Sequence, residues 1–354
     1  MKHVYVFGAG ASAASANTPL GSELVWNYPS NCGQVPPINN GVPDLSEENE
    51  SFKNFSSFLK LVTTIYPELN SLPQNWDNRG MWVFIPQVEK KHYVDEMLEI
   101  LHLKRNNQGV ELVRKLIFEH LVESSIGNPN QLYKKFISEV LKNSQQQISI
   151  ISFNFDFLLH EDFEKDVYFD YLLEFNWIDD NRQRTYAKNQ PFNLIKPNGS
   201  LDWGICPSCN RLYLYFHHMF KNFYDNKRCS DCGSQIQPFI IIPHERYGNI
   251  IEPLWLSAAN DLKVADKVII IGYSFPDYDK RVSNFFAKSL NSYAKLEIVN
   301  YCEHEKDKAR EKNTILAKYN RIFPGLRSEI DIHLDGFEGY LNRYVDGNAY
   351  ERGG

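Results

Sequence analysis

The sequence has no long hydrophobic run. No stretch approaches the roughly 18 apolar residues that a membrane-spanning helix requires. The N-terminal segment MKHVYVFGAG contains an apolar run that is too short for the hydrophobic region of a signal peptide, and it leads directly into a glycine turn. We therefore expect a cytoplasmic protein that is not associated with a membrane.

Positive charge is not in excess either. The 354 residues include 38 Lys and Arg against 44 Asp and Glu, which gives a formal net charge of −6. Proteins that bind nucleic acid in general present a basic face, so we do not expect nucleic acid as a direct ligand. The hydrophobic content of 43% is ordinary for a globular protein, and the length allows one large core or two domains.

Cysteine is scarce, but four of the six cysteines form two C-x-x-C pairs, Cys206 with Cys209 and Cys229 with Cys232. In a chain without a signal peptide, this pattern favours a metal site over disulfides. Four thiolates close a tetrahedral shell that has no open position for water. We predict a structural Zn²⁺ ion in a small zinc ribbon. The alternative is two redox-active or idle pairs of thiols.

Strand and helix patterns alternate along much of the chain. Continuous apolar runs are typical of strands that are covered on both faces, and helical segments between them imply a parallel sheet. We predict the α/β class, with a Rossmann-like parallel sheet, helices on both of its faces, a helical insertion and the zinc-ribbon module. The expected strands lie at 3–7, 148–154, 192–199, 239–245, 266–275 and 296–301, and two of the expected helices at 254–265 and 277–290.

The patterns also suggest a division into modules. Residues 51–146 have helical periodicity, as in GVELVRKLIFEHLVES, where apolar residues recur at helical spacing. The expected modules are a discontinuous Rossmann-like domain at 1–30, 148–203 and 234–340, a helical insertion at 31–147, the zinc ribbon at 204–233 and a C-terminal tail at 341–354.

Three strand ends carry glycines or small polar residues. The segment Gly8-Ala9-Gly10-Ala11-Ser12 follows the first strand, where backbone N–H groups and a helix start can bind a phosphate. The third glycine of the common dinucleotide fingerprint is absent, and a tight turn explains the segment equally well. Further along, Asn154 and Asp156 end one strand and Gly272 and Ser274 follow another. Such residues line ligand crevices in parallel sheets, or they cap helices and shape turns.

The order of these motifs resembles the sirtuin (SIR2) superfamily. That family shows a GAGxS loop, a (T)xNxD motif, an HG turn, a zinc ribbon, a GTS-like motif and an Asn-bearing strand. This chain has, in the same order, GAGAS, SFNFD, an NG turn, the two C-x-x-C pairs, IGYSF and IVNY. The resemblance spans most of the chain outside residues 31–147.

The details look like bacterial SIR2-like proteins rather than protein deacylases. TPLGSEL, at 18–24, is similar to their P-x-G-x-x-L variant, SFNFDFLLHEDF is similar to their NYDxLLE form, and the PDFRG stretch of deacylases is absent. Many such proteins degrade NAD⁺ as effectors of antiphage defence, in oligomers or with a partner protein that gates them. The resemblance therefore implies NAD⁺ as substrate, and a homo-oligomer or a separate defence protein as partner.

The resemblance also assigns roles to individual residues. Asn154 would be the catalytic amide and Asp156 its supporting carboxylate. The residues that would contact the cofactor are Gly8, Ala9, Gly10 and Ser12 at the phosphates, Gly199 in the NG turn, Gly272 and Ser274, and Asn300 at the adenosine ribose.

One position departs from the family. The catalytic histidine of the HG turn is Asn198 here, and an amide cannot act as a general base. Loss of nicotinamide from NAD⁺ needs no protonation of the leaving group, so this change should harm acyl transfer more than NAD⁺ hydrolysis. His244 and His160 are candidates for a substitute base.

Three functions follow from this reading. The leading one is an NAD⁺ glycohydrolase that releases nicotinamide and ADP-ribose, as a gated defence effector. The second is an NAD⁺-dependent protein deacylase. The third is a catalytically degenerate sensor or scaffold that binds NAD⁺ or ADP-ribose without turnover.

Overall fold

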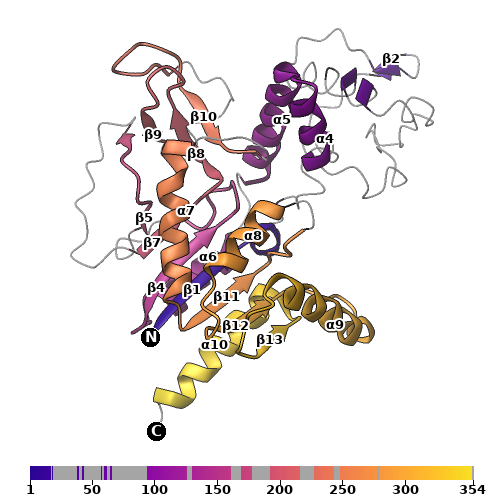
Figure 1. Ribbon diagram of the computed structural model, residues 1–354, viewed down its shortest axis with the longest axis vertical. Coiled ribbons are helices and arrows are strands. Elements are labelled where there is room, and N and C mark those ends of the chain that lie inside the picture. The colour runs from indigo at the N-terminus through magenta and orange to yellow at the C-terminus, as the bar shows by residue number, and fades with distance from the viewer. Residues whose placement is uncertain are drawn as a thin grey trace.

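The computed structural model describes two lobes (Figure 1). The residues that it describes are 1–16, 18, 38–39, 42–43, 57, 60–61, 64–65, 94–125, 130–160, 169–177, 192–215, 227–242, 248–276 and 279–352. Within these residues, no helix is long and apolar enough to cross a membrane.

The larger lobe is built on a parallel sheet of seven strands. Its order is β13-β12-β11-β1-β4-β7-β5, and every pair of neighbours is parallel. The predicted α/β class with a Rossmann-like parallel sheet is confirmed. The strands are β1 (Lys2–Phe7), β4 (Gln147–Ser152), β5 (Phe169–Asp170), β7 (Phe192–Ile195), β11 (Lys267–Ile271), β12 (Lys295–Val299) and β13 (Ile330–His333).

Two groups of helices cover the sheet, one on each face. The side chains of β1 are apolar on both faces for this reason. Successive side chains of a strand point to opposite faces. Tyr5 and Phe7 meet the ring of Phe136 on one face, at 5.0 and 5.1 Å between centroids, while Val4 and Val6 are fully buried on the other. The first group comprises α1 (Ala9–Ala16), α6 (Gln131–Lys135), the π-helical turn η2 (Phe136–Leu141) and α10 (Gly336–Arg352).

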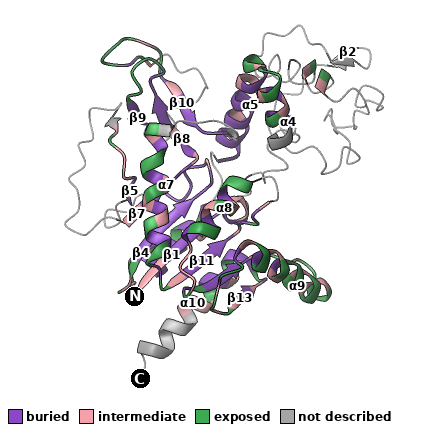
Figure 2. Ribbon diagram, viewed as in Figure 1, coloured by how far each residue is buried: buried purple, intermediate pink, exposed green. Residues whose placement is uncertain are grey.

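The second group lies across the opposite face. There α7 contacts β7 and α8, and α8 contacts α9. Figure 1 shows α7 and α8 in front of the strands, and Figure 2 shows the strands behind them as buried. These helices are α7 (Gly248–Lys263), α8 (Lys280–Ser289) and α9 (Glu305–Ile322).

The smaller lobe joins a second sheet to a pair of helices. The sheet has the order β10-β8-β9-β6, and α5 contacts β8. Leu116 and Val113 of α5 share a buried core with Leu201, Tyr213 and both buried cysteines. The elements are α4 (Val94–Leu103), α5 (Asn107–Ser125), β6 (Asn176–Trp177), β8 (Gly199–Ile205), β9 (Leu212–Leu214) and β10 (Gln237–Ile240), while β2 (Ile38–Asn39) and β3 (Val42–Pro43) form a separate hairpin.

This arrangement differs from the modules that the sequence suggested. The helices α4 and α5 and the cysteine segment share one core, although we expected two separate modules. Helix α6 and η2, which belong to the expected insertion at 31–147, pack instead against the parallel sheet. Periodicity marks a helix but does not show which core the helix covers.

The strand expected at 239–245 is not part of the parallel sheet. It forms β10, which ends at Ile240 and pairs antiparallel with β8. Residues 239–242 are all apolar because alternate residues face different cores: Phe239 and Ile241 face the core of the large lobe, and Ile240 and Ile242 that of the small lobe. Residues 243–245 lie outside the described residues. This segment therefore joins the two lobes.

The C-terminal segment also differs from the expected tail at 341–354. Helix α10 continues to Arg352. Tyr340 and Leu341 are buried in the main core, which is the packing that holds the start of this helix in place.

Candidate functional site

The order of the parallel sheet changes direction beside β1. The chain moves from β1 to β4 and β7 on one side, and then returns to β11 on the other side. In open parallel sheets a ligand crevice lies at such a point, outside the carboxyl ends of the strands. Three backbone bonds of 3.0 Å connect these ends here, from Gly8 N to Ile271 O, from Gly10 N to Gly272 O and from Phe153 N to Phe7 O.

The glycines at this edge are required by a close approach of two loops. Gly272 has a φ of +66°, and a Cβ on it would lie 2.2 Å from the backbone nitrogen of Ala11. A Cβ on Gly8 would lie 2.6 Å from Cα of Tyr273. The N–H groups of Gly8, Gly10 and Ala11 all donate within the protein. Donors to a phosphate would therefore come from the other N–H groups of the first turn of α1, beginning with Ala9.

The side-chain amide of Asn154 is fixed in this edge. The residue is 7% exposed. Its Nδ2 donates to the carbonyl oxygen of Gly8 at 3.0 Å and to Oγ of Ser12 at 2.8 Å, which uses both amide hydrogens. Among the residues that the structure describes, no donor contacts its Oδ1. The arrangement therefore leaves a carbonyl oxygen of fixed orientation as an acceptor for a ligand hydroxyl or a water.

The side chain of Asp156 bonds to the backbone of its own loop. It is buried, and its Oδ1 accepts a hydrogen bond from the backbone nitrogen of Leu158 at 3.2 Å. This bond stabilises a local turn, since the described residues 157–160 after Asp156 form a turn and not a helix that it could cap. Within the described part of the chain, no hydrogen bond joins the side chains of Asp156 and Asn154.

The segment 196–201 binds the carbonyl groups of the loop that carries Asn154. Nδ2 of Asn198 donates to the carbonyl oxygen of Phe153 at 3.1 Å. The carbonyl of Phe155 accepts from Oγ of Ser200 at 3.3 Å and from the backbone nitrogen of Leu201 at 2.8 Å. Asn198 therefore acts through its amide donor, as a link between the two segments.

Gly199 makes this turn possible. Its φ is +76°, and a Cβ on it would lie 2.1 Å from the carbonyl oxygen of Phe239. The backbone oxygen of Asn198 also accepts from the nitrogen of Ile241 at 2.8 Å. The turn is therefore held against β10 as well as against the Asn154 loop.

Lys196 is a buried residue of this region that the sequence reasoning did not identify. Its side chain is almost fully buried, and its Nζ donates to the carbonyl oxygen of Asp156. Burial lowers the pKa of Lys196, and the carboxylates of Asp156 and Asp202 oppose that shift. The signal for such a buried charge was a lysine directly after the buried strand residues Leu194 and Ile195.

His160 does not lie at the crevice. It is 2% exposed, and its Nε2 lies 2.9 Å from Oδ2 of Asp202. Burial lowers the pKa of His160, which favours the neutral imidazole. His160 is therefore a partner of Asp202 rather than a base for the reacting atoms. His244, the other candidate base, lies outside the described residues.

Ser274 and Asn300 lie at the same sheet edge but have different surroundings. Ser274 is exposed, and the residue after it, Phe275, has a φ of +47°. Asn300 is half-buried, and its backbone bonds to His333 and Gly336, at 2.9 Å each. No side-chain hydrogen bond of either residue occurs within the described part of the chain, so both side chains are available to a ligand.

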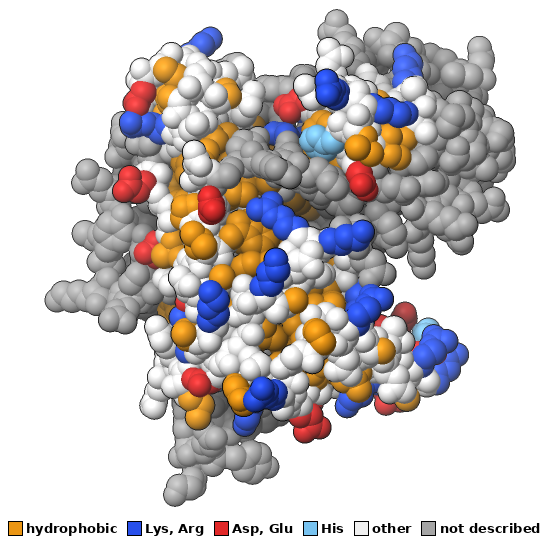
Figure 3. Space-filling view, in the orientation of Figure 1, with side chains coloured by type: hydrophobic (Ala, Val, Ile, Leu, Met, Phe, Trp, Pro, Cys, Tyr) orange, Lys and Arg blue, Asp and Glu red, His pale blue; other side chains and the backbone are white. Residues whose placement is uncertain are grey.

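Aromatic side chains pack around Phe153, the residue before Asn154, on the side of α7 and α8. Phe153 lies 5.1 Å from the ring of Tyr273 and 6.0 Å from that of Trp255. Arg281 lies over Trp255, at 4.4 Å from the ring centroid. Figure 3 shows hydrophobic side chains gathered in the middle of this face of the molecule, with Lys and Arg side chains beside them.

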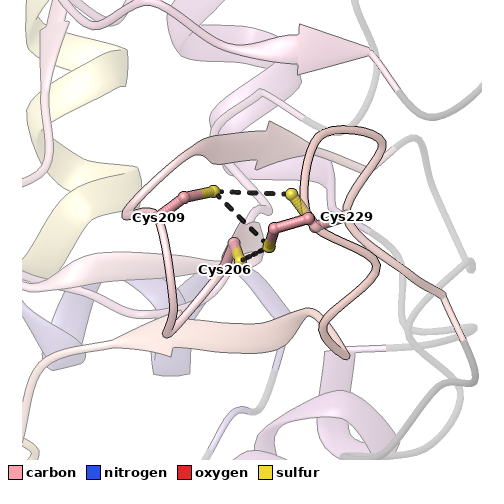
Figure 4. Close-up of side chains that lie close together, drawn as sticks. Cys206, Cys209 and Cys229 are labelled. Atoms are coloured by element: carbon pink, nitrogen blue, oxygen red, sulfur yellow. Dashed lines mark hydrogen bonds between the residues drawn. The ribbon is translucent and has the colours of Figure 1, made fainter.

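The four paired cysteines converge in the small lobe. Their sulfur atoms all lie within 4.8 Å of one another, and Figure 4 shows the sulfurs of Cys206, Cys209 and Cys229 turned toward each other. The distances are 3.3 Å for Cys206–Cys232, 3.5 Å for Cys209–Cys229 and 3.9 Å for Cys209–Cys232. Sulfurs around a tetrahedral zinc ion lie roughly 3.8 Å apart, so this cluster could hold one such ion.

One neighbour favours the thiolate form in this cluster. The hydroxyl of Tyr213 donates to Sγ of Cys229 at 3.1 Å and lowers the pKa of that thiol to about 6. A thiolate is the form of cysteine that binds a metal.

Comparison with known proteins gives matches only among solved structures. No protein-family model matches the chain, and no curated protein matches it. The chain is similar to a Sir2 protein from work on the mechanism and regulation of Sir2 enzymes, with 16% identity, a TM-score of 0.44, and coverage of 100% of this chain and 94% of that one.

Two further structures have comparable similarity. One is a mutant Sir2 homologue in complex with 2′-O-acetyl-ADP-ribose, with 14% identity, a TM-score of 0.45, and coverage of 98% of this chain and 92% of that one. The other is a Sir2 protein bound to a propionylated peptide, with 14% identity, a TM-score of 0.43, and coverage of 98% of this chain and 93% of that one.

The glycine contact leads to a test of stability. Gly272 and Gly336 both have positive φ, at +66° and +74°, but only Gly272 faces backbone within 3 Å. We expect Gly336→Ala to lower the free energy of unfolding by about 1–2 kcal/mol and Gly272→Ala by roughly 3–5 kcal/mol, because a clash adds to the strain. Denaturant unfolding measures both, and equal losses would contradict the close approach.

The Asn198 link leads to a second test. Asn198→Asp keeps the size of the side chain but removes the N–H donor to Phe153. We expect the free energy of unfolding to fall by about 1–3 kcal/mol at neutral pH, because a carboxylate then faces a carbonyl oxygen. Asn313→Asp, on the exposed face of α9, is the control and should change stability little. If Asn198→Asp is as stable as the control, Asn198 does not hold the loop.

Proposed function

We propose that this protein is an NAD⁺ glycohydrolase that releases nicotinamide and ADP-ribose. The observation that supports this proposal most directly is the buried amide of Asn154. Its nitrogen is held by Gly8 and Ser12, and its oxygen accepts no hydrogen bond from the residues that the structure describes. The proposal joins this geometry to the order of motifs that resembles the SIR2 superfamily.

The hydrolysis of NAD⁺ does not depend on a strong general base. The bond between C1′ of the ribose and the nicotinamide nitrogen breaks, and its electron pair neutralises the positive ring. Water then adds to the oxocarbenium-like carbon and releases one proton. In this proposal Oδ1 of Asn154 holds a ribose hydroxyl or the attacking water, and burial excludes other water molecules. Asp156 supports Asn154 indirectly, by shaping the turn that follows it.

The remaining residues of the proposed site contact the cofactor. Gly8, Ala9, Gly10 and Ser12 would lie at the phosphates, where glycines admit close approach of the backbone. Gly272 and Ser274 would lie beside them, Gly199 would shape the opposite wall, and Asn300 would bond to the adenosine ribose. The exposed hydroxyl of Ser274 and the half-buried Asn300 suit these roles.

Asn198 makes hydrolysis the favoured reaction. Transfer of an acyl group requires a base that deprotonates a ribose hydroxyl, and Asn198 cannot accept a proton. Among the described residues near the loop, His160 is buried against Asp202 and does not replace it. His244 stays a candidate for a base or a contact to substrate.

We also propose that the four cysteines hold one structural Zn²⁺ ion. Cys206, Cys209, Cys229 and Cys232 would complete its tetrahedral shell, and the ion would stabilise the small lobe without a part in the chemistry.

The setting of the activity follows from the resemblance to bacterial SIR2-like proteins. We propose a cytoplasmic effector of antiphage defence, held inactive until a partner protein or a homo-oligomer releases it. No direct contact with nucleic acid or membrane belongs to this proposal.

The activity is tested by incubating the full chain with NAD⁺, alone and with proteins encoded beside it, and resolving the products. We expect nicotinamide and ADP-ribose. O-acyl-ADP-ribose formed from an acylated lysine peptide would instead identify a deacylase. Binding of ADP-ribose without nicotinamide release would identify a sensor or scaffold.

The role of Asn154 is tested by substitution. Asn154→Ala should lower kcat by about 100-fold or more, because the reaction loses a fixed acceptor in a buried site. Asn313→Ala, on exposed α9, should keep the activity of the native chain. Equal release of nicotinamide by Asn154→Ala and the native chain would exclude this site.

The metal proposal predicts about one zinc per chain by elemental analysis. Cys229→Ser should lower both the zinc content and the melting temperature of the protein. Cys302→Ser is the control, because Cys302 lies outside the cluster. A fully folded native protein that contains no metal would contradict the proposal.

A further inference from the structure

A buried tyrosine from another part of the chain contacts the Asn154 amide. The hydroxyl of Tyr133, in α6, lies 3.0 Å from Oγ of Ser12 and 3.5 Å from Nδ2 of Asn154. Tyr133 lies within the helical region of the sequence, 21 residues before Asn154. None of the motifs quoted above includes it.

The hydrogen bonds of this cluster join Tyr133 to the Asn154 amide through Ser12. Nδ2 of Asn154 donates to Oγ of Ser12 at 2.8 Å. The hydroxyl groups of Tyr133 and Ser12 share a bond in which either oxygen can donate, and the Tyr133 oxygen can also accept from Nδ2 of Asn154. Ser12 Oγ therefore bonds to both residues, and Tyr133 fixes the oxygen that holds Asn154.

The ring of Tyr133 has little freedom to move. It is 1% exposed and packs edge-on against Phe7 and Phe337, at 5.4 and 5.5 Å between centroids. Burial raises the pKa of Tyr133, so that the hydroxyl stays protonated and able to donate. A rigid hydroxyl partner of this kind is what a catalytic amide needs in order to keep one orientation.

The backbone of α6 is tied to the same loop by a second set of bonds. The nitrogen of Tyr133 donates to Oγ of Ser15 at 3.3 Å, and Ser15 donates to Oδ1 of Asn130 at 3.0 Å. Nδ2 of Asn130 donates to the carbonyl oxygen of Leu158. Helix α6 is thereby bound to α1 and to the residues that follow Asn154.

We propose that Tyr133 is a positioning residue that orients the carboxamide of Asn154 through Ser12. The proposal rests on the proposed function, because it assigns Asn154 to the reaction. It makes α6 part of the site, with Tyr133 acting through Ser12.

The test is Tyr133→Phe, which removes the hydroxyl and keeps the ring. Tyr340→Phe is the matched control, because Tyr340 shares an equally buried hydroxyl bond of 3.0 Å with Tyr5. With NAD⁺ as substrate, we expect kcat of Tyr133→Phe to fall roughly fivefold to tenfold, the effect of one neutral hydrogen bond, with KM within about twofold. Tyr340→Phe should keep the native kcat. Thermal unfolding of both variants shows that each is folded.

A second readout does not depend on activity. Selective ¹⁵N labelling of asparagine gives the side-chain NH₂ signals, and the signal lost in Asn154→Ala is that of Asn154. We expect this signal to shift and its protons to exchange faster with solvent in Tyr133→Phe, and to be unchanged in Tyr340→Phe.

The two readouts separate the two proposals. If the native chain does not cleave NAD⁺, the proposed function fails, and the NH₂ signal alone decides the role of Tyr133. An Asn154 signal that is the same in Tyr133→Phe and Tyr340→Phe overturns the positioning role in every case. A shifted signal with an unchanged kcat, in a native chain that is active, overturns it as well.

Discussion

The loop from Phe153 to Asp156 is held from both of its sides, and the arrangement of the two lobes depends on this. On one side, the Asn154 amide bonds to Gly8 and Ser12 of the large lobe. On the other side, the carbonyl groups of Phe153, Phe155 and Asp156 accept bonds from the segment 196–201. A buried loop without such partners would leave polar groups unsatisfied, at a cost of about 1–3 kcal/mol each. The bonds to these three carbonyl groups and from the Asn154 amide therefore hold the loop in place.

The same region explains the buried charges. Lys196, Asp202 and His160 are removed from water, which is tolerated only where each has a partner. Lys196 bonds to the carbonyl oxygen of Asp156, and His160 bonds to Asp202. These groups are turned toward one another and toward the loop backbone. Their effect on a reaction would come from keeping the loop in place.

Asn198, which stands where the sequence resemblance predicts a histidine, has a structural meaning as well as a chemical one. An amide can donate to the carbonyl of Phe153 at any pH, and it cannot act as a base. A site with this residue suits a reaction in which a cation forms and the leaving group departs unprotonated. Such a site needs dipoles that keep a fixed orientation toward the reacting atoms. In this chain, the hydrogen bonds among Asn154, Ser12 and Tyr133 fix the amide dipole of Asn154.

The sequence by itself determined the class of the fold, five of the seven strands of the parallel sheet (β1, β4, β7, β11 and β12) and the C-x-x-C pairs of the four cysteines. Apolar runs, glycine turns and C-x-x-C spacing depend on neighbours along the chain, so they can be read without a structure. Only the tertiary structure decided that α4 and α5 share a core with the cysteine lobe, and that the run 239–242 faces two cores. It also decided that Tyr133 and Lys196 hold the Asn154 loop. These contacts join residues far apart in the chain, and a side chain buried by distant partners carries no local pattern that shows which partners they are.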